Sequence, residues 1–169
     1  DDEQLKISIK YNVEKGEKYK VNKITISGNT RTRDKVIRRE IKIKEQENYS
    51  GTKIKKSKSF INRRNYFEFV NIKEVPSKDK PNYLDLEVEV EEKPTGYFSI
   101  QGGYSSVEAL LLGVQIQENN LFGYGKSLGA SVTVGTVSQN FLIDYFDPYF
   151  LDTSYQFGLQ LFKREYQYI

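Results

Sequence analysis

The second half of the chain, from about residue 95 to its end, repeats one pattern five times. Each repeat is a short segment in which every second residue is apolar and the residues between are small or polar. Successive side chains of a strand point to opposite sides, so each segment is predicted to be a strand with one apolar face. The apolar positions are Phe98, Ile100 and Tyr104; Leu110, Leu112, Val114 and Ile116; Leu128, Ala130, Val132 and Val134; Phe141, Ile143 and Tyr145; and Tyr155, Phe157, Leu159 and Leu161.

The opposite face of these strands carries mainly Gly, Ser, Thr and Gln, with a rare Asp. A water-soluble sheet would carry Lys and Glu there, whereas small polar residues suit a curved and crowded lumen. The pattern therefore favours the wall of an antiparallel transmembrane β-barrel, with the apolar face toward lipid. Because each single segment is a weak signal, a soluble β-sandwich or lipocalin-like meander is the alternative.

Composition changes sharply near Pro94. Residues 1–92 hold 39 of the 49 charged residues, whereas residues 93–169 hold 15 of the 23 aromatic residues and 9 of the 12 glycines. The first part has a net charge of +5 and the second of −2. The sequence therefore predicts two domains, and so mild a charge does not indicate a nucleic-acid partner.

Several kinds of site are excluded by residue type. The chain has neither Cys nor His, so disulfides, thiolate metal sites and histidine-based catalysis are excluded, along with the usual zinc ligands. No apolar run approaches the ~18 residues of a spanning helix. Residues 123–127 end like a phosphate-binding loop, but Asn120 stands where that motif needs Gly. We expect no catalytic residue, no cofactor and no metal, and hence no enzyme.

The first domain is predicted to be α+β, in the order strand, helix, helix, strand, strand. A strand over 21–27 precedes a helix capped by Thr32 and extending to Ile41. A basic helix over 53–64 has one narrow apolar stripe and should lie on a surface. Its cations, Lys53, Lys55, Lys56, Lys58, Arg63 and Arg64, are interpreted as a solvated face, as is the row of carboxylates formed by Asp85, Glu87, Glu89 and Glu91 on the last strand.

The first domain resembles a POTRA domain. The resemblance rests on the segment Ile-Thr-Ile-Ser-Gly-Asn at 24–29, on Arg39-Glu40, on residues 57–67 ending in Asn-Tyr-Phe, and on the last strand over 84–90. The segments that follow resemble the opening strands of a BamA-type outer-membrane assembly barrel, of the bacterial surface antigen family. The matching motifs there are Thr95-Gly96, Gly103-Tyr104, the turn 118–125 and Asp-Pro-Tyr-Phe at 147–150.

The resemblance implies a domain plan. Residues 1–19 would end a preceding POTRA domain, residues 20–93 would form a POTRA domain, and residues 94–169 would supply about five strands of an incomplete barrel. Both chain ends are then expected to be cuts in a longer protein. The chain departs from the family at Arg64, where Leu is usual, and at Asn65, where Gly is usual. These departures predict a second helix that ends loosely or in a shifted position.

Aromatic residues gather in two of the four predicted turns between barrel strands. If the first strand leaves a periplasmic domain, the second and fourth turns face the periplasm. They carry Phe122, Tyr124, Tyr149 and Phe150, which are predicted to form an interfacial aromatic belt. The alternative is that these aromatic residues close a soluble core.

Strand edges suggest how such a protein could act. An outer strand of the POTRA sheet would leave backbone groups unpaired, so that a client peptide or an accessory subunit could add as a further strand. The predicted edge residues are Phe69, Val70, Asn71, Ile72, Lys73 and Glu74. The resemblance implies a lateral gate at the first barrel strand, formed by Gly96, Tyr97, Phe98, Ser99, Ile100, Gln101, Gly102, Gly103 and Tyr104, whose glycines lower strand stability.

The function implied by the resemblance is folding and insertion of β-barrel proteins into the bacterial outer membrane, with the POTRA domain in the periplasm. The implied partners are unfolded outer-membrane proteins, accessory assembly lipoproteins and the lipid bilayer. Two alternatives stay open. One is a POTRA-containing secretion or autotransporter-assembly transporter, and the other is a soluble periplasmic β-rich binding module.

Overall fold

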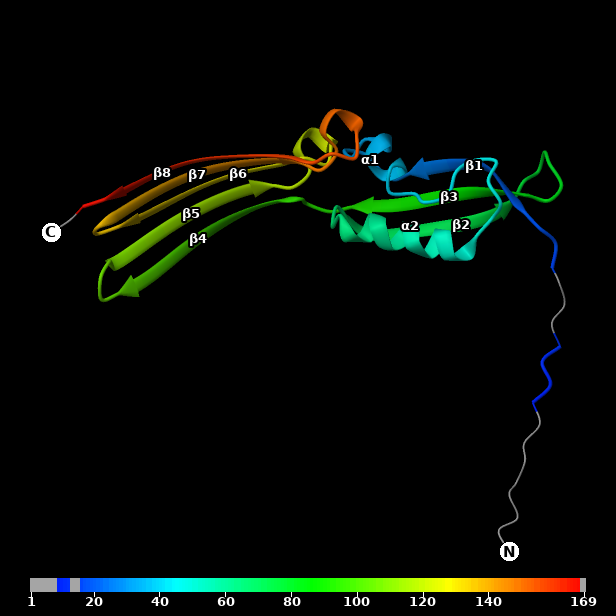
Figure 1. Cartoon of the computed structure of the whole chain (residues 1–169), viewed down its shortest axis with the longest axis horizontal. Coiled ribbons are helices and arrows are strands. Elements are labelled where there is room, and N and C mark those ends of the chain that lie inside the picture. The colour runs from blue at the N-terminus through cyan, green and yellow to red at the C-terminus, as the bar shows by residue number, and fades with distance from the viewer. Residues whose placement is uncertain (1–8, 13–15, 168–169) are drawn as a thin grey trace, which may run out of the picture.

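The chain folds into two units joined end to end, with the first domain at one end and a curved sheet at the other (Figure 1). The structure is a computed structural model that describes residues 9–12 and 16–167. In this part of the chain, neither helix is long and apolar enough to cross a membrane.

The first domain has the predicted element order. It contains β1 (Lys20–Ser27), α1 (Asp34–Arg38), α2 (Gly51–Arg63), β2 (Phe67–Pro76) and β3 (Tyr83–Glu92). The sheet order is β1-β3-β2, with β1 parallel and β2 antiparallel to the central strand β3. The fold class predicted for this half is confirmed.

One face of this sheet and the two helices form the hydrophobic core. The narrow stripe of α2, Ile54, Ser57 and Ile61, is buried, and the remainder of the helix faces outward as predicted. The other buried members of the core include Val21, Ile24, Val36, Ile37, Ile43, Tyr66, Phe67, Val70, Leu86, Val88 and Val90. On β3 Glu87 and Glu91 are exposed, as predicted for a solvated row of carboxylates, whereas Asp85 and Glu89 are partly buried and form ion pairs with Lys23 and Lys73.

The start of α1 differs from the prediction. Its N-cap residue is Arg33, in an extended conformation and without a side-chain cap, and the helix ends at Arg38 instead of reaching Ile41. Thr32 does not cap the helix. Its hydroxyl instead accepts a hydrogen bond from the amide of Asn120, 2.8 Å away in the second domain. The Thr32 side chain, which local propensity favours as a helix cap, therefore makes a tertiary contact instead.

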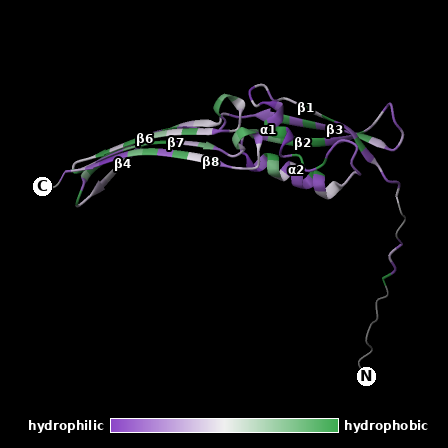
Figure 2. Ribbon diagram, turned by 45° about the horizontal axis from the view of Figure 1, so that its top comes forward, coloured by the Kyte–Doolittle hydropathy of each residue, from purple (hydrophilic) through white to green (hydrophobic). Residues whose placement is uncertain are grey.

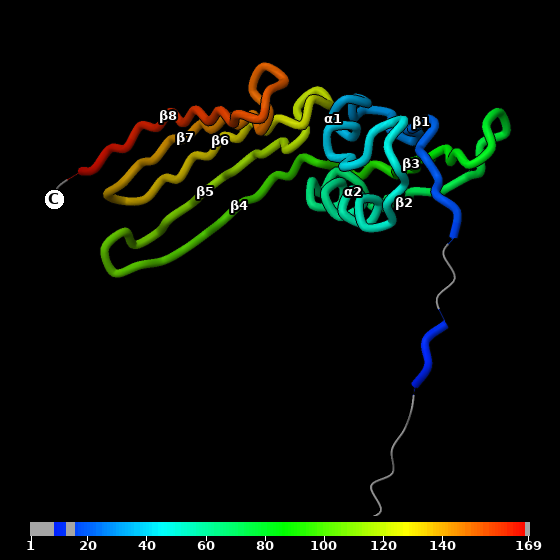
Figure 3. The backbone as a smooth tube through the Cα atoms, turned by 45° about the vertical axis from the view of Figure 1, so that its right-hand side comes forward, coloured from blue at the N-terminus to red at the C-terminus, as the bar shows by residue number. Residues whose placement is uncertain are grey.

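The second domain is a five-stranded antiparallel meander in the order β4-β5-β6-β7-β8. Its elements are β4 (Gly96–Ser105), β5 (Ala109–Glu118), the short 3₁₀ helix η1 (Leu121–Gly123), β6 (Ser127–Gly135), β7 (Ser138–Asp147), η2 (Phe150–Asp152) and β8 (Phe157–Tyr166). The strands form one curved layer that does not close on itself, as the tube in Figure 3 shows. The sequence pattern thus predicted all five strands of this incomplete barrel wall.

The prediction that residues 1–19 end a preceding domain lies mostly outside the described residues. The described stretches 9–12 and 16–19 belong to no helix or strand.

Gly28 makes a tight turn possible at the end of β1. Its φ is +88°, and a Cβ atom there would lie 1.9 Å from the carbonyl oxygen of Val90. We expect Gly28→Ala to destabilise the first domain by about 2 kcal/mol or more, because a left-handed backbone and a clash combine. Urea unfolding of the first domain measures this. Gly16→Ala is the control, since no atom lies within 4 Å of a Cβ at Gly16; equal midpoints for the two variants would contradict the prediction.

Candidate functional site

The apolar residues of the second domain form a continuous exposed surface. Strand register places Ile100, Val114, Val132 and Phe141 in one row across β4 to β7. All four are exposed, and Ile100 reaches 71%. Figure 2 shows hydrophilic colours frequent on the first domain and hydrophobic colours recurring along the strands of the second. Soluble monomers rarely expose so large an apolar patch, so this face is suited to lipid.

The opposite face is polar and crowded at its middle. A Cβ atom on Gly129 would lie 2.1 Å from Oε1 of Gln117 and 2.4 Å from Oδ1 of Asp144, the residues beside it on the neighbouring strands. A larger residue here would force the side chains of these two neighbours to move aside. The arrangement agrees with the small polar lumen predicted from the sequence.

Strand β4, which holds the predicted gate residues, lies at one edge of the described sheet. Only its side toward β5 is paired in this part of the chain. A Cβ atom at Gly102 or Gly103 would meet nothing closer than 3.9 Å, the side chains of Leu112 and Leu111 respectively. Packing within the described residues thus has room for a larger residue at either position.

Strand β2, which holds the predicted edge residues 69–74, is an edge strand of the first sheet. The other edge strand, β1, is partly covered by the segment 45–49. The amide of Val21 donates to the carbonyl oxygen of Glu47, and the amide of Ile24 donates to the carboxylate of Glu45, each at 2.9 Å. Among the described residues no such segment lies beside β2, so β2 is the freer edge.

The six predicted edge residues differ in exposure. Phe69, Lys73 and Glu74 are exposed, Asn71 and Ile72 are half-buried, and Val70 lies in the core. Lys73 forms an ion pair with Glu89 on β3. The phenol of Tyr49 donates to Glu74 at 2.7 Å, and this hydrogen bond, with some burial, raises the pKa of Tyr49 to about 12.

The turn between β5 and β6, residues 118–126, is docked on the first domain. The Asn120 amide group donates to Thr32 and accepts from the backbone amide of Gly125, both at 2.8 Å. The amide of Arg33 donates to the carbonyl oxygen of Gly123 at 3.0 Å. Gly123 has φ +74°, and a Cβ there would lie 2.0 Å from the Arg31 carbonyl oxygen, so the two backbones meet at glycine.

Glu92, at the end of β3, organises the loop that receives this turn. Its carboxylate accepts from the Thr30 hydroxyl at 2.7 Å and from the amides of Arg31 and Thr32 at 2.8 and 2.5 Å. Partial burial opposes the charge, but these donors outweigh it and hold the pKa of Glu92 below its ordinary value.

The second turn, residues 147–153, is held by a buried carboxylate. Glu40 is 1% exposed, and its Oε1 lies 2.6 Å from Nη2 of Arg64. The phenol of Tyr149 donates to the same oxygen at 3.2 Å and accepts from Arg64 at 3.3 Å. The guanidinium of Arg39 lies over the Tyr149 ring, 4.0 Å from its centre. One aromatic residue of the barrel turn thus contacts three charged residues of the first domain.

The two arginines of this cluster are affected differently by their surroundings. Burial lowers the pKa of Arg39, whose Nε and Nη2 atoms are buried without a hydrogen-bond acceptor. Burial also opposes the charge of Arg64, but the carboxylate of Glu40 outweighs it and raises the Arg64 pKa. The expectation of a loose helix end at this position is wrong, because Arg64 is bound to Glu40 and Asn65 adopts the left-handed conformation, with φ +60°.

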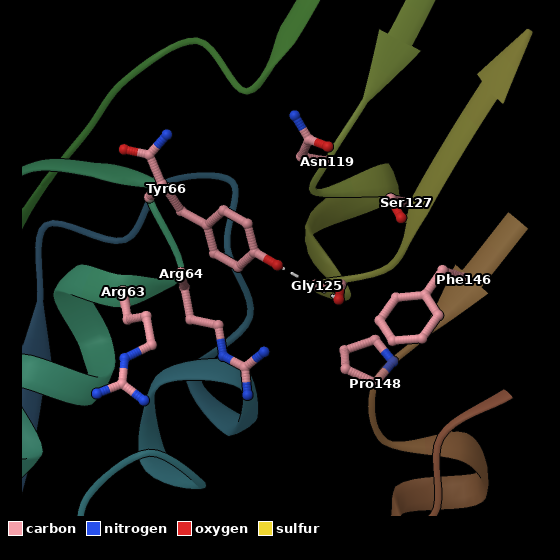
Figure 4. Close-up of a pocket in the computed structure, with 9 residues that line it drawn as sticks. Arg63, Arg64, Tyr66, Asn119, Gly125, Ser127, Phe146 and Pro148 are labelled. Atoms are coloured by element: carbon pink, nitrogen blue, oxygen red, sulfur yellow. Dashed lines mark hydrogen bonds between the residues drawn. The ribbon is translucent and has the colours of Figure 1, made fainter. Parts of the chain in front are cut away.

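A cavity of about 360 Å³ lies between the end of α2 and the two turns. Figure 4 shows Tyr66 reaching across it toward Gly125, with Phe146 and Pro148 on the opposite wall. The phenol of Tyr66 donates to the Gly125 carbonyl oxygen at 3.4 Å. By strand alternation Phe146 lies on the polar face of the sheet, so the cavity is on the lumen side of the joint.

The four predicted interfacial aromatic residues do not share one environment. Tyr124 contacts Arg33, whose guanidinium lies 4.1 Å from its ring centre, and Tyr149 lies in the Glu40 cluster. Phe122 is 82% exposed and Phe150 is 38% exposed. Both turns lie beside the first domain, as the turn topology predicted, but the sequence pattern did not show that the two tyrosines form the joint.

Each of these turns contains a bulky apolar residue in the left-handed conformation. Phe122 has φ +51° and Leu151 has φ +53°. Such a backbone costs on the order of 1–3 kcal/mol for a residue other than glycine. Leu151 was not singled out by the sequence, because no pattern marks a left-handed residue that is neither Gly nor Asn.

Among the described residues, no group of three or more Asp or Glu side chains is placed to hold a metal ion.

The Glu40 cluster gives a test of the joint. We expect Glu40→Gln to destabilise the protein by about 3 kcal/mol or more, because Arg39 and Arg64 would stay partly buried without a carboxylate. Urea unfolding, together with trypsin cleavage after Arg64, measures the effect. Glu89→Gln is the matched control: it removes only the exposed pair with Lys73 and should change little. A Glu40→Gln variant as stable as this control would show that the cluster does not hold the joint.

Comparison with known proteins assigns both domains to families. The POTRA family, described as surface antigen variable number repeat, matches residues 19–93, and the Omp85 superfamily domain matches residues 120–168. The outer membrane protein assembly factor BamA of Neisseria meningitidis serogroup B is 30% identical over 91% of this chain and 19% of its own length. The BamA of Neorickettsia risticii is 34% identical over 94% of this chain and 21% of its own length.

Solved structures agree with this assignment. The crystal structure of BamA from Haemophilus ducreyi lacking POTRA domains 1–3 matches with a TM-score of 0.80 and 29% identity, over 88% of this chain and 28% of that one. CdiB from Acinetobacter baumannii shares the fold, with a TM-score of 0.59 and 16% identity over 86% of this chain and 28% of that one. The chain spans about one fifth of the length of the curated relatives named above. The chain therefore matches the POTRA family over its first domain and the Omp85 superfamily domain over most of its second, in the order found in BamA-type proteins.

Proposed function

We propose that this chain is part of a protein that folds and inserts β-barrel proteins into the bacterial outer membrane. The observation that carries the proposal is the combination of an exposed apolar sheet face, an edge strand β4, and a POTRA domain fixed beside them. The named relatives are outer membrane protein assembly factors, which supports the same role.

In this proposal the second domain lies in the outer membrane and the POTRA domain in the periplasm. The apolar face of β4 to β8 contacts lipid, and the turns 118–126 and 147–153 lie on the periplasmic side. The charge difference between the two domains fits this placement, since most charged residues belong to the domain that would remain in water.

The first step of the mechanism is capture of an extended segment by β2. A client or an accessory lipoprotein adds as a further strand beside residues 69–74. Main-chain hydrogen bonds supply the affinity, so clients of unrelated sequence can be accepted. The exposed Phe69 gives such a segment an apolar contact as well.

The second step is strand pairing at β4. In lipid an unpaired backbone N–H or C=O costs several kcal/mol of free energy. A client strand that pairs with β4 avoids this cost when it enters the bilayer. Gly102 and Gly103 lack side chains on either face of β4, which lets this strand bend away from a weakly held neighbour. No covalent chemistry or nucleotide hydrolysis is needed, and we propose that the chain is not an enzyme.

Pairing at β4 can be tested by cross-linking. The chain has no Cys, so a cysteine introduced by substitution is the only position in it that can form a disulfide. We expect Ile100→Cys on β4 to form a disulfide with a cysteine in the last strand of a client during insertion. Val114→Cys on β5 is the matched control, because it lies opposite Ile100 but its strand is paired on both sides. Equal cross-linking at the two positions would rule out β4 as the client-pairing edge.

Capture at β2 is tested in the same way with an unfolded client in solution. We expect Phe69→Cys on β2 to cross-link to the client more than Thr25→Cys on β1, because the segment 45–49 covers part of β1. Both positions are exposed, so accessibility alone does not separate them. The prediction fails if the β1 variant cross-links equally well.

Depletion of the protein in the cell separates assembly from secretion: assembly predicts loss of many outer-membrane barrels, whereas a dedicated transporter affects one exported protein.

A further inference from the structure

We propose that the two turns beside the POTRA domain form a binding site for phospholipid headgroups of the periplasmic leaflet. The site consists of the cations around Tyr124 and of the exposed residues Phe122 and Leu151. It rests on the proposed membrane placement and adds a specific lipid contact to it.

The depth of the site follows from strand register. Leu128 on β6, Tyr145 on β7 and Leu159 on β8 form a row near the periplasmic end of the apolar face. Lys126 lies two residues beyond Leu128, which is about 7 Å along a strand. Its ammonium group forms an ion pair with Asp147 at 3.0 Å. On β8 the apolar face continues to Phe157, opposite Asp147, so Lys126 lies at the end of the apolar surface, where the headgroups would begin in the proposed membrane placement.

Three cations surround the ring of Tyr124. The charged groups of Arg33, Lys35 and Lys126 lie 4.1, 5.5 and 5.9 Å from its centre. Asp147 and Asp152 pair with the two lysines, and Arg33 forms no ion pair with the described residues. A cavity of about 230 Å³ beside Tyr124 is lined by both lysines. The site therefore carries a net positive charge next to an aromatic ring, which suits a phosphate group at a membrane interface.

The strained turns supply the apolar part of the site. Phe122 and Leu151 are 82% and 79% exposed, and both have the left-handed backbone described above. A turn in water would favour Gly or Asn at such a position, because these residues adopt it with little strain. Two turns of different sequence instead present a large apolar side chain. Burial of these side chains at the boundary of headgroups and acyl chains accounts both for their exposure in the protein and for the presence of a large apolar residue at a strained position.

Lipid is the occupant because the site continues the lipid-facing surface. Lys126 and Asp147 lie on the same side of the sheet as Leu128 and Tyr145, as strand alternation shows. The lumen-side cavity lined by Arg64 and Phe146 is on the other side.

Tryptophan quenching by lipids tests the apolar contact. The chain has no Trp, and any Trp elsewhere in the full-length protein is replaced by Phe. The protein is refolded into vesicles of phosphatidylcholine brominated near the headgroup. We expect Phe122→Trp to be quenched and Phe69→Trp, on the POTRA edge strand, to remain unquenched. Phe141→Trp, on the apolar sheet face, reports whether the wall lies in lipid. If Phe141→Trp is quenched and Phe122→Trp is not, this inference fails alone; if neither is quenched, the membrane placement fails as well.

Lipid selectivity tests the phosphate contact. With spin-labelled lipids, we expect the wild-type protein to prefer phosphatidylglycerol over phosphatidylcholine. The double variant Arg33→Gln and Lys35→Gln should lose about fivefold of this preference per cation removed. Both residues are exposed, so the variant should fold. The matched control, Lys55→Gln with Lys56→Gln, removes two exposed cations of α2 and should keep the preference. Equal preference in the two double variants would overturn the headgroup site.

Discussion

A backbone N–H or C=O group left unpaired in lipid costs several kcal/mol, and the described sheet ends in two strands with one unpaired side each. These are β4 and β8. The rest of the architecture depends on how that demand is met. Pairing β4 with another strand of the same barrel meets it permanently. In the proposed function, pairing β4 with a client strand meets it for as long as the client is held, and this exchange of partners needs no reactive side chain.

The joint between the domains holds two turns of the second domain against the first domain. It combines a buried polar contact, Asn120 to Thr32, with a buried charge cluster around Glu40. Both contacts carry a penalty when half of the pair is lost, so they favour one docked arrangement over many loose ones. Gly123 lets the first turn approach the backbone of the POTRA domain closely, and Gly125 lies against the side chains of Arg39 and Val36. The joint thus fixes the geometry of the two domains as well as contributing to stability.

Most of the fold could be predicted from the sequence, because it depends on local periodicity. The alternation of Leu128, Ala130 and Val132 identified a strand without knowledge of its neighbours, and the same holds for Leu86 and Val88. The joint could not be predicted, because it depends on contacts between residues distant in the sequence. Thr32 has the chemistry of a helix cap and was predicted to be one, but its hydroxyl binds Asn120, 88 residues away. The aromatic residues were predicted as an interfacial group, yet only contacts distinguish Tyr149, which binds Glu40, from the exposed Phe122.

The joint also has a consequence for movement. The docked turns belong to the hairpins formed by β5 with β6 and by β7 with β8, and β4 is paired along its whole length with β5. The POTRA domain therefore moves as one body with the β4 side of the barrel. In the proposed function, opening of the barrel therefore displaces the strands on the other side of β4 and leaves the distance between β2 and β4 unchanged. A client segment bound at β2 then reaches β4 after a constant length of chain, whatever the width of the opening.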